Sequence, residues 1–218
     1  MSKNILNIHP DILDKKRQEV LQKLTPFIKD FVLGGGTALS LFLSHRKSFD
    51  FDFFSQSPIP KKLLENLSRK LTIDHVAIDT SDELTFFTND NIKITFLYYP
   101  FNPQFVPIKA KNDLVLFPVK EIALQKAYTI GRRGEYRDYF DLYIIFKNSY
   151  ISLDEVIDKT KQEYGGLFDE KMFLEQLVYF GDITNFEIIS ASNTPLPPPD
   201  EIKHYFEELV KTYLTSYF

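Results

Sequence analysis

The chain has 218 residues, a formal net charge of −4 and no cysteine, so disulfides, zinc–thiolate sites and cysteine nucleophiles are excluded. Hydrophobic residues make up 44% and charged residues 26% of the chain, which is ordinary for a globular protein of one large domain or two small ones. The acidic balance provides no overall basic field, so any contact with nucleic acid must come from a local patch. The N-terminal residues lack the apolar run of a signal peptide and no stretch is apolar enough to span a membrane, so we expect a cytoplasmic protein with no membrane partner.

The first half of the chain predicts a mixture of helices and strands. The predicted elements are, in chain order, a helix at 11–23, a strand at 31–33, a helix at 38–43 opened by Thr37, a strand at 48–54, a helix at 61–70, and strands at 73–78, 84–88 and 92–99. Residues 48–54 alternate strictly, which predicts phenylalanines on one face of that strand and aspartates on the other.

The second half predicts helices only. They are expected at 119–130, 138–148, 153–163, 169–180 and 201–217, after a proline-bearing loop at 100–107 and with a stiff Pro-rich loop at 195–199 before the last helix. Because the chain looks helical beyond residue 111, we predict two lobes, 1–112 and 113–218, and an α+β fold class.

Asp50 and Asp52 are the first candidate functional residues. Residues two apart on a strand share a face, with Cα atoms about 7 Å apart. Two carboxylates placed in this way can bind Mg²⁺, which also prefers phosphate and water oxygens. The alternative is a solvated polar face of an edge strand. Two like charges on one face, with no lysine between them, favour the metal site because they repel unless a cation neutralises them.

The glycine turn at 34–36 is the second candidate. Glycines allow a backbone to approach an anion closely, and the following helix N-terminus attracts phosphate. Thr37 would cap that helix or donate its hydroxyl to a phosphate oxygen; a plain strand-to-helix turn is the alternative. Turn, short helix and acidic strand in succession would bring the turn beside Asp50 and Asp52. Between them, Arg46 and its basic neighbours either contact phosphate or RNA, or only end the helix with favourable charge.

Lys126 is the third candidate, because it lies on the apolar stripe of a predicted helix. It either extends past the core to solvent or directs its ammonium group at a triphosphate. Asp138 is interpreted as the N-cap of the next helix. Asp141, one turn further on, would pair with Lys126 or Arg137 and orient it. No metal-ligand spacing links the four histidines.

These residues together resemble a known family. Residues 31–54, FVLGGGTALSLFLSHRKSFDFDFF, are similar to the first motif of the AbiEii-type nucleotidyltransferases. These are the toxin halves of bacterial abortive-infection and toxin–antitoxin systems, within the polymerase-beta-like nucleotidyltransferase superfamily. Residues 119–146, VKEIALQKAYTIGRRGEYRDYFDLYIIF, resemble the second block, in which a lysine on a helix precedes an acidic helical segment. The resemblance runs in order over most of the chain.

The resemblance implies a polymerase-beta-like N-terminal lobe, made of a mixed sheet with helices, and a helical C-terminal lobe, with a nucleotide in the cleft between them. It implies Mg²⁺-dependent transfer of a nucleoside monophosphate from an NTP to an acceptor (RNA, tRNA or protein), and a cognate antitoxin. Carried over residue by residue, it places phosphate at Gly35, Gly36 and Thr37, metal at Asp50 and Asp52, the triphosphate at Lys126, and Asp141 near that lysine.

One position departs from the superfamily pattern, which has a third carboxylate on a later strand. Thr95 occupies the corresponding place in the strand at 92–98, which contains no acid. Either another residue such as Asp141 takes this role, or the protein is a nucleotide-binding regulator with weak or no transferase activity. A third hypothesis is an interaction module that retains only the fold, which predicts no rise in melting temperature with NTP.

Overall fold

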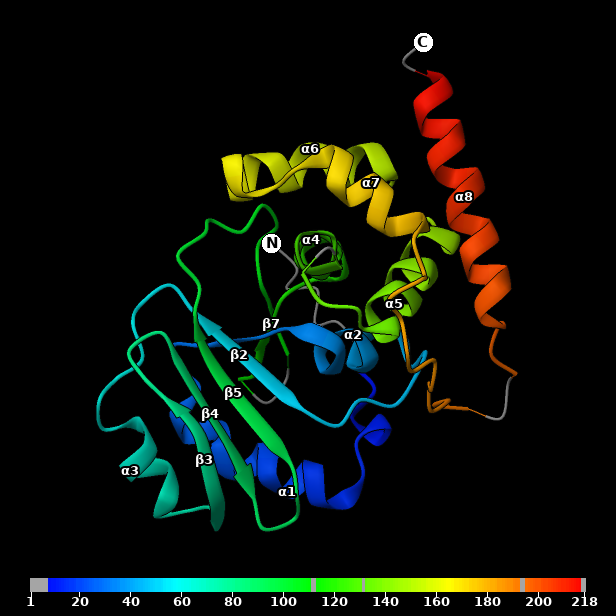
Figure 1. Ribbon diagram of the computed structural model, residues 1–218. Helices are drawn as coiled ribbons and strands as arrows, with labels where there is room; N and C mark the ends of the chain where they lie inside the picture. Colours follow the sequence, from blue (N-terminus) through cyan, green and yellow to red (C-terminus); the bar gives the residue numbers. More distant parts are fainter. Residues whose placement is uncertain (1–7, 111–112, 131, 193–194, 217–218) are drawn as a thin grey trace, which may run out of the picture. The chain divides into compact units, whose positions relative to one another are not determined.

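The computed structural model describes residues 8–110, 113–130, 132–192 and 195–216. The chain divides into two compact units, Met1–Phe101 with Val106–Pro118, and Asn102–Phe105 with Val119–Phe218. The first is a mixed sheet with helices and the second is helical (Figure 1). The α+β class predicted from the sequence is therefore confirmed. The lobe division between residues 112 and 113 stays a prediction.

One mixed sheet organises the first unit. In the described residues its strands are β1 (Val32–Leu33), β2 (Phe51–Ser55), β3 (Ile73–Asp79), β4 (Glu83–Thr88), β5 (Lys93–Tyr98), β6 (Ile108–Lys109) and β7 (Val115–Leu116). Their order is β3-β4-β5-β2-β1-β7-β6. The central pair β2 and β5 is parallel, whereas β2 pairs with β1, and β5 with β4, in antiparallel fashion. Sequence analysis missed β6 and β7, since two-residue strands carry no readable alternation.

The apolar face of this sheet is built on phenylalanine. Phe51, Phe53 and Phe96 are fully buried, and the rings of Phe53 and Phe96 stack with centroids 5.2 Å apart. Burying a phenylalanine side chain stabilises a fold by about 1.5–3 kcal/mol. Helices α1 (Lys15–Leu24) and α3 (Leu63–Ser68) lie on this side (Figure 1). The Arg17 guanidinium of α1 lies 4.7 Å from the Phe49 ring centroid, and its Nε donates to the Phe49 carbonyl at 3.0 Å.

Helix α2 (Gly35–Leu43) begins earlier than the sequence predicts. Gly34 is its N-cap residue in extended geometry, with no capping side chain. Thr37 therefore lies inside the first turn, and the prediction that it caps the helix is wrong. Five consecutive residues of α2, from Thr37 to Leu41, are buried, so the helix is enclosed on all sides, as an all-round apolar helix should be.

Five α-helices build the described part of the second unit: α4 (Val119–Ile130), α5 (Tyr136–Lys147), α6 (Leu153–Tyr164), α7 (Glu170–Val178) and α8 (Pro199–Ser216). Helix α4 packs against α5, α6 and α7, and α8 packs against α5, α6 and α7. Their contacts are apolar, with Ile122, Leu142, Val156 and Phe206 fully buried. Helix α5 begins at Tyr136, because Glu135 and not Asp138 is the N-cap residue. The prediction for Asp138 is wrong.

The segment Asn102–Phe105 belongs to the helical unit because a buried carboxylate holds it there. Glu121 on α4 is fully buried, and its Oε2 accepts hydrogen bonds from the backbone N–H groups of Gln104 and Phe105, each at 3.0 Å. Burial raises the pKa of the Glu121 carboxyl. The hydrogen bond with Glu163 and the two backbone hydrogen bonds lower this pKa by a smaller amount, so the pKa lies above its ordinary value.

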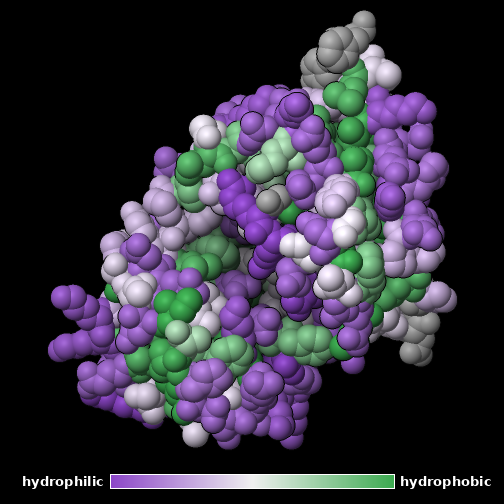
Figure 2. All heavy atoms as spheres, in the orientation of Figure 1, coloured by the Kyte–Doolittle hydropathy of each residue, from purple (hydrophilic) through white to green (hydrophobic). Residues whose placement is uncertain are grey.

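A groove runs between α7 and α8 in the same unit. Its volume is 740 Å³, and Leu174, Val178, Val210 and Leu214 contribute apolar lining. Figure 2 shows hydrophobic side chains along α8, and Leu214 is 43% exposed. No helix in the described part of the chain is long and apolar enough to cross a membrane.

Candidate functional site

The glycine turn and the acidic strand meet in the first unit, as the sequence predicts. The Gly34 N–H donates to the Asp52 carbonyl at 2.9 Å, which joins the start of α2 to β2. Gly35 has φ +62°, and a Cβ on it would lie 2.7 Å from Oδ2 of Asp52. Both the backbone conformation and the space therefore require glycine, because the Asp52 carboxylate lies directly against the first residue of α2.

Gly36 brings a basic side chain to the same turn. A Cβ on Gly36 would clash with the Arg46 guanidinium and would lie 3.2 Å from the Ser48 hydroxyl. Arg46 is only 4% exposed, and its Nη1 donates to the Lys47 carbonyl at 3.0 Å. Arg46 therefore lies against the turn itself, whereas Lys47 is exposed. Whether Arg46 contacts phosphate or RNA, or only ends the helix with favourable charge, stays open.

Thr37 is buried, and its hydroxyl is used within the protein. The hydroxyl lies 2.9 Å from the Ser48 hydroxyl and makes a short hydrogen bond to the Asp50 carbonyl. It thus fixes the backbone that carries the first of the two acids. A contact of this hydroxyl with phosphate stays a prediction. Ser48 is a site residue that sequence analysis missed, since a serine before an alternating strand carries no distinctive signal.

Asp52 lies on the face of β2 opposite Phe51 and Phe53, whereas Asp50 immediately precedes the strand, which begins at Phe51 and not at residue 48 as predicted. Phe51 and Phe53 are fully buried, whereas Asp52 is partly exposed, which confirms the predicted alternation within β2. Asp50 is also partly exposed. Among the described residues, no three Asp, Glu, His or Cys side chains gather into a metal cluster. Two carboxylates nonetheless suit Mg²⁺, which takes its other ligands from water and from substrate phosphates. The donor chemistry at Asp50 and Asp52 therefore fits the metal that the sequence predicts.

The start of α2 also provides anion donors. The first N–H groups of a helix have no partner within the helix and carry the positive end of its dipole. In α2 these groups belong to Gly35, Gly36 and Thr37, beside Asp52. A phosphate bound there and a metal ion bound to Asp52 would be neighbours, which is the arrangement that a metal-bound triphosphate needs.

Thr95 takes the place that the sequence predicts beside the acids. It pairs in register with Asp52 across the parallel strands β5 and β2, so both side chains lie on one face of the sheet. Thr95 is 4% exposed. Strand β5 contains no acid, and the third carboxylate of the superfamily is not on this strand.

Lys126 belongs to a separate cluster in the second unit. Its Nζ lies 2.5 Å from Oδ1 of Asp138 and 2.7 Å from Oδ2 of Asp141, and all three side chains are at most 6% exposed. Lys126 therefore does not extend to solvent. The predicted pairing with Asp141 is confirmed. Asp138 was missed, although its i, i+3 spacing to Asp141 places both carboxylates on one face of α5.

The charge balance of this cluster keeps Asp138 ionised. Burial raises the pKa of the Asp138 carboxyl. The charges of Lys126 and Arg133, and their hydrogen bonds, lower this pKa by more than burial raises it, so it lies below its ordinary value. Arg133 contributes through Nε, 2.7 Å from Oδ2, and Nη2, 3.1 Å from Oδ1. Sequence analysis missed Arg133 as a partner of Asp138. Whether Lys126 contacts a triphosphate stays a prediction.

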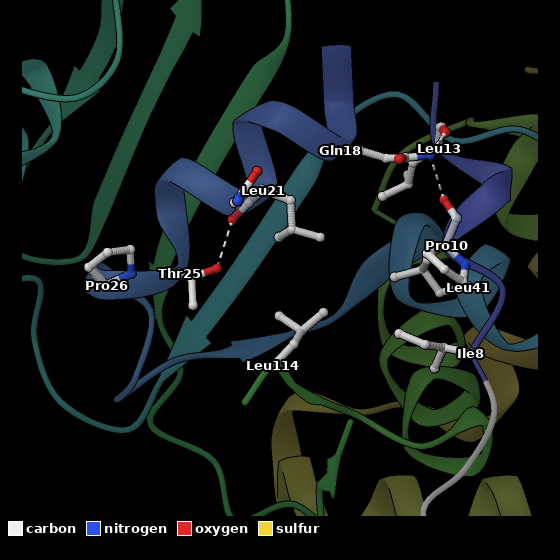
Figure 3. A pocket seen from close by; sticks show the side chains of 10 residues that line it. Ile8, Pro10, Leu13, Gln18, Leu21, Thr25, Pro26, Leu41 and Leu114 are labelled. Atoms are coloured by element: carbon white, nitrogen blue, oxygen red, sulfur yellow. Dashed lines mark hydrogen bonds between the residues drawn. The ribbon is translucent and has the colours of Figure 1, made fainter. Parts of the chain in front are cut away.

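The first unit also has an apolar pocket of 630 Å³ (Figure 3). Leu13, Leu21, Leu41 and Leu114 line it, and none of its lining residues is charged. The Thr25 hydroxyl in its wall donates to the Leu21 carbonyl at 3.1 Å. A pocket without charged groups does not suit a triphosphate, so the candidate nucleotide site in this unit remains the glycine turn.

The chain is similar to known proteins over most of its length. The model of the family described as "Nucleotidyl transferase AbiEii toxin, Type IV TA system" matches residues 19–211. A protein of Aquifex aeolicus (strain VF5) described as "Uncharacterized protein aq_aa25" is 32% identical over 214 residues, covering 94% of this chain and 98% of that protein.

Solved structures share the fold. The crystal structure of JHP933 from Helicobacter pylori matches with a TM-score of 0.50 and 18% identity, over 97% of this chain and 100% of that one. The nucleotidyltransferase toxin MenT4, Rv2826c from Mycobacterium tuberculosis H37Rv, matches with a TM-score of 0.44 and 15% identity, over 78% of this chain and 63% of that one. The second similarity is too low to support an argument.

Proposed function

This chain belongs to the AbiEii family of nucleotidyltransferase toxins, and we propose that it transfers a nucleoside monophosphate from a nucleoside triphosphate to an acceptor with the help of Mg²⁺. The observation that carries the proposal is the contact between the Asp52 carboxylate and Gly35 at the start of α2. There an acid that would bind the metal and N–H groups that would bind phosphate share one place in the fold.

The residues of the first unit divide the work of binding. Asp50 and Asp52 would hold the metal, which supplies positive charge to the triphosphate and to the departing pyrophosphate. The N–H groups of Gly35, Gly36 and Thr37 would bind phosphate oxygens. Thr37 would also keep the Asp50 backbone in place through its hydrogen bond to the carbonyl. Arg46, buried against Gly36, would add positive charge beside the phosphates.

The second unit would supply a cation that is already oriented. Lys126 would bind the triphosphate, with Asp138 and Asp141 fixing its ammonium group. The acceptor would be an RNA such as tRNA, or a protein, and the partner in the cell would be a cognate antitoxin. We place this activity in the bacterial cytoplasm, as part of an abortive-infection or toxin–antitoxin response.

The direct test measures transfer of label. Wild-type protein, Mg²⁺ and each α-labelled NTP are incubated with total RNA or total protein, in parallel with Asp52→Asn and Asp79→Asn. Asp79 is an exposed acid on β3 and serves as the matched control. We expect labelling by wild type and Asp79→Asn, and a loss of at least about 100-fold with Asp52→Asn. Equal labelling by wild type and Asp52→Asn would contradict the proposal.

A nucleotide-binding regulator is the second candidate, and Thr95 in register with Asp52 is the observation that favours it. This function predicts Mg²⁺-dependent NTP binding, detected as a rise in melting temperature, without release of pyrophosphate for any acceptor. Pyrophosphate release that depends on Asp52 would eliminate it.

A further inference from the structure

A line of hydrogen-bonded side chains crosses the acidic face of the sheet. The Thr85 hydroxyl on β4 donates to Oε1 of Glu83 at 2.7 Å, and the hydroxyl oxygens of Thr85 and Thr95 are hydrogen-bonded at 3.3 Å. Thr85 and Thr95 are 3% and 4% exposed, whereas Glu83 is partly exposed. The line therefore connects Thr95, which is buried on β5, to Glu83 on the neighbouring strand β4.

The register of the strands places this line beside the candidate metal ligands. Thr85 pairs with Thr95 across β4 and β5, and Thr95 pairs with Asp52 across β5 and β2. Paired residues point to the same face of a sheet, and neighbouring strands are about 4.8 Å apart. Asp52, Thr95 and Thr85 thus form one row across the three strands. Glu83 lies on β4, two residues before Thr85, and therefore on the same face of the sheet.

With Glu83 ionised, the hydroxyl protons have one arrangement that satisfies both hydrogen bonds. A hydroxyl carries a single proton and two acceptor lone pairs. In the shorter bond the Thr85 hydroxyl donates its proton to a hydrogen bond with the Glu83 carboxylate, because an ionised carboxylate can only accept. Thr95 must then donate its own proton to Thr85. This leaves the lone pairs of the Thr95 hydroxyl oxygen able to accept a proton on the same face as Asp52.

We propose that Glu83 replaces the missing third carboxylate, as the final proton acceptor of a relay through Thr85 and Thr95. The inference rests on the proposed transferase function. As the acceptor hydroxyl oxygen bonds to the α-phosphorus, the bond to pyrophosphate breaks and its electron pair leaves with pyrophosphate. The proton of the acceptor hydroxyl passes to Thr95, the Thr95 proton to Thr85, and the Thr85 proton to Glu83. Thr95 would touch the reacting hydroxyl, and Glu83 is a positioning residue that acts through it.

The surroundings of Glu83 keep it in place. Its backbone N–H donates to the Thr80 hydroxyl at 3.0 Å, and its carbonyl accepts from the Thr80 N–H at 2.9 Å. Charged residues on the adjoining elements include Asp82 beside it in the chain, Asp79 on β3, paired with Leu84, and Lys93 on β5, paired with Phe87. Of the two candidate metal ligands, Asp52 lies on β2 and Asp50 just before it. The other candidate third acid, Asp141, is bonded to Lys126 in the second unit.

A purely structural explanation exists, since two buried threonine hydroxyls next to each other need hydrogen-bond partners. It predicts that variants lose stability but keep the pH profile of the reaction. The relay predicts a change in kcat and in its pH profile, because the proton acceptor itself is removed.

The test compares Glu83→Gln, Thr85→Val and Thr85→Ser with wild type. Glu65→Gln, an exposed acid on α3 paired with Arg69, is the control. For Glu83→Gln and Thr85→Val we expect kcat to fall about 100-fold, less than twofold change in KM for NTP, and loss of the acid limb of the pH profile. Thr85→Ser retains the hydroxyl group and should rescue the kcat and the acid limb that Thr85→Val loses, whereas Glu65→Gln should keep the wild-type kcat and pH profile. Melting temperature and Mg²⁺-dependent NTP affinity check that each variant is folded.

Three outcomes are informative. If wild type transfers label and Glu83→Gln and Thr85→Val retain kcat and the acid limb, the relay is wrong while the proposed function stands. If wild type transfers no label with any NTP and acceptor, the proposed function fails and the relay fails with it. If Thr85→Val does not fold, Glu83→Gln against Thr85→Ser decides, because Glu83→Gln keeps the size of the side chain and Thr85→Ser keeps the hydroxyl group while removing only one methyl group.

Discussion

The two clusters of candidate residues are built in opposite ways. In the first unit the acids Asp50 and Asp52 are partly exposed, and Asp52 lies against Gly35. In the second unit Lys126 and its two carboxylates are at most 6% exposed and satisfy one another. The first cluster contains one acid on β2 and one just before it, and it suits a cation from outside. The second already contains its own counter-charges.

This difference suggests that the first cluster serves ligand binding above all and the second serves the stability of the fold above all. Side chains held ready for a ligand are stabilised only when the ligand arrives, and until then they cost stability. Side chains that satisfy one another are part of the fold, and removing one of them leaves buried charge. We therefore expect changes in the glycine turn and its acids to affect activity above all, and changes around Lys126 to affect stability above all.

The largest expected effect on stability comes from Lys126→Met. The change leaves the buried carboxylates of Asp138 and Asp141 without their shared cation, and breaking a buried pair in this way costs about 3–5 kcal/mol. Urea unfolding at neutral pH measures the loss. Lys120→Met is the control, because Lys120 lies on the same helix and pairs with Glu155 at 2.9 Å with side chains that are 40% and 36% exposed. About 1 kcal/mol or less is expected there. Equal losses for the two variants would show that the Lys126 cluster is not an integral part of the fold.

A smaller loss is expected from Gly35→Ala. The residue would adopt φ +62° with a Cβ 2.7 Å from the Asp52 carboxylate, and strain of this kind costs about 1–3 kcal/mol. Transfer of label should fall more sharply than stability, since the carboxylate must move. Gly166→Ala is the control, because a Cβ there meets nothing within 4 Å, and both stability and transfer should be close to wild type. Full activity in Gly35→Ala would mean that the contact with Asp52 is not needed.

The contrast between the two clusters also explains what could be predicted from the sequence. The alternation at 49–54 is a local signal, so the face of β2 that carries Asp52 followed from it directly. The approach of Gly35 to Asp52 could be predicted because a turn, a short helix and a strand follow one another closely. The fully buried phenylalanines confirm the same period.

The residues that sequence analysis misplaced depend on contacts across the fold. Thr37 has the side chain of a helix cap, but its hydroxyl bonds to the Asp50 carbonyl, thirteen residues along the chain. Asp138 also resembles a cap, yet its carboxylate is taken by Lys126 and Arg133. The line from Glu83 through Thr95 to Asp52 depends on the register of three strands, which no pattern within a single strand reveals.

The smallest expected effect is an acid dependence of stability that comes from the second cluster. The pKa of Asp138 in the folded protein lies below its ordinary value of 3.8 because Lys126 and Arg133 outweigh the effect of burial. A carboxyl with a lowered folded pKa contributes stability that is complete above its unfolded pKa and is lost as pH falls through the folded pKa. The urea midpoint of wild type should therefore fall more steeply below pH 3.8 than that of Asp138→Asn.

Asp113→Asn is the comparison, since Asp113 pairs with Lys109 in an ion pair whose side chains are 65% and 77% exposed. Solvent and salt screen such a pair, so it contributes little to the free energy of unfolding. Its acid slope should match wild type. An Asp138→Asn slope as steep as that of wild type would mean that the buried cluster does not set the acid sensitivity.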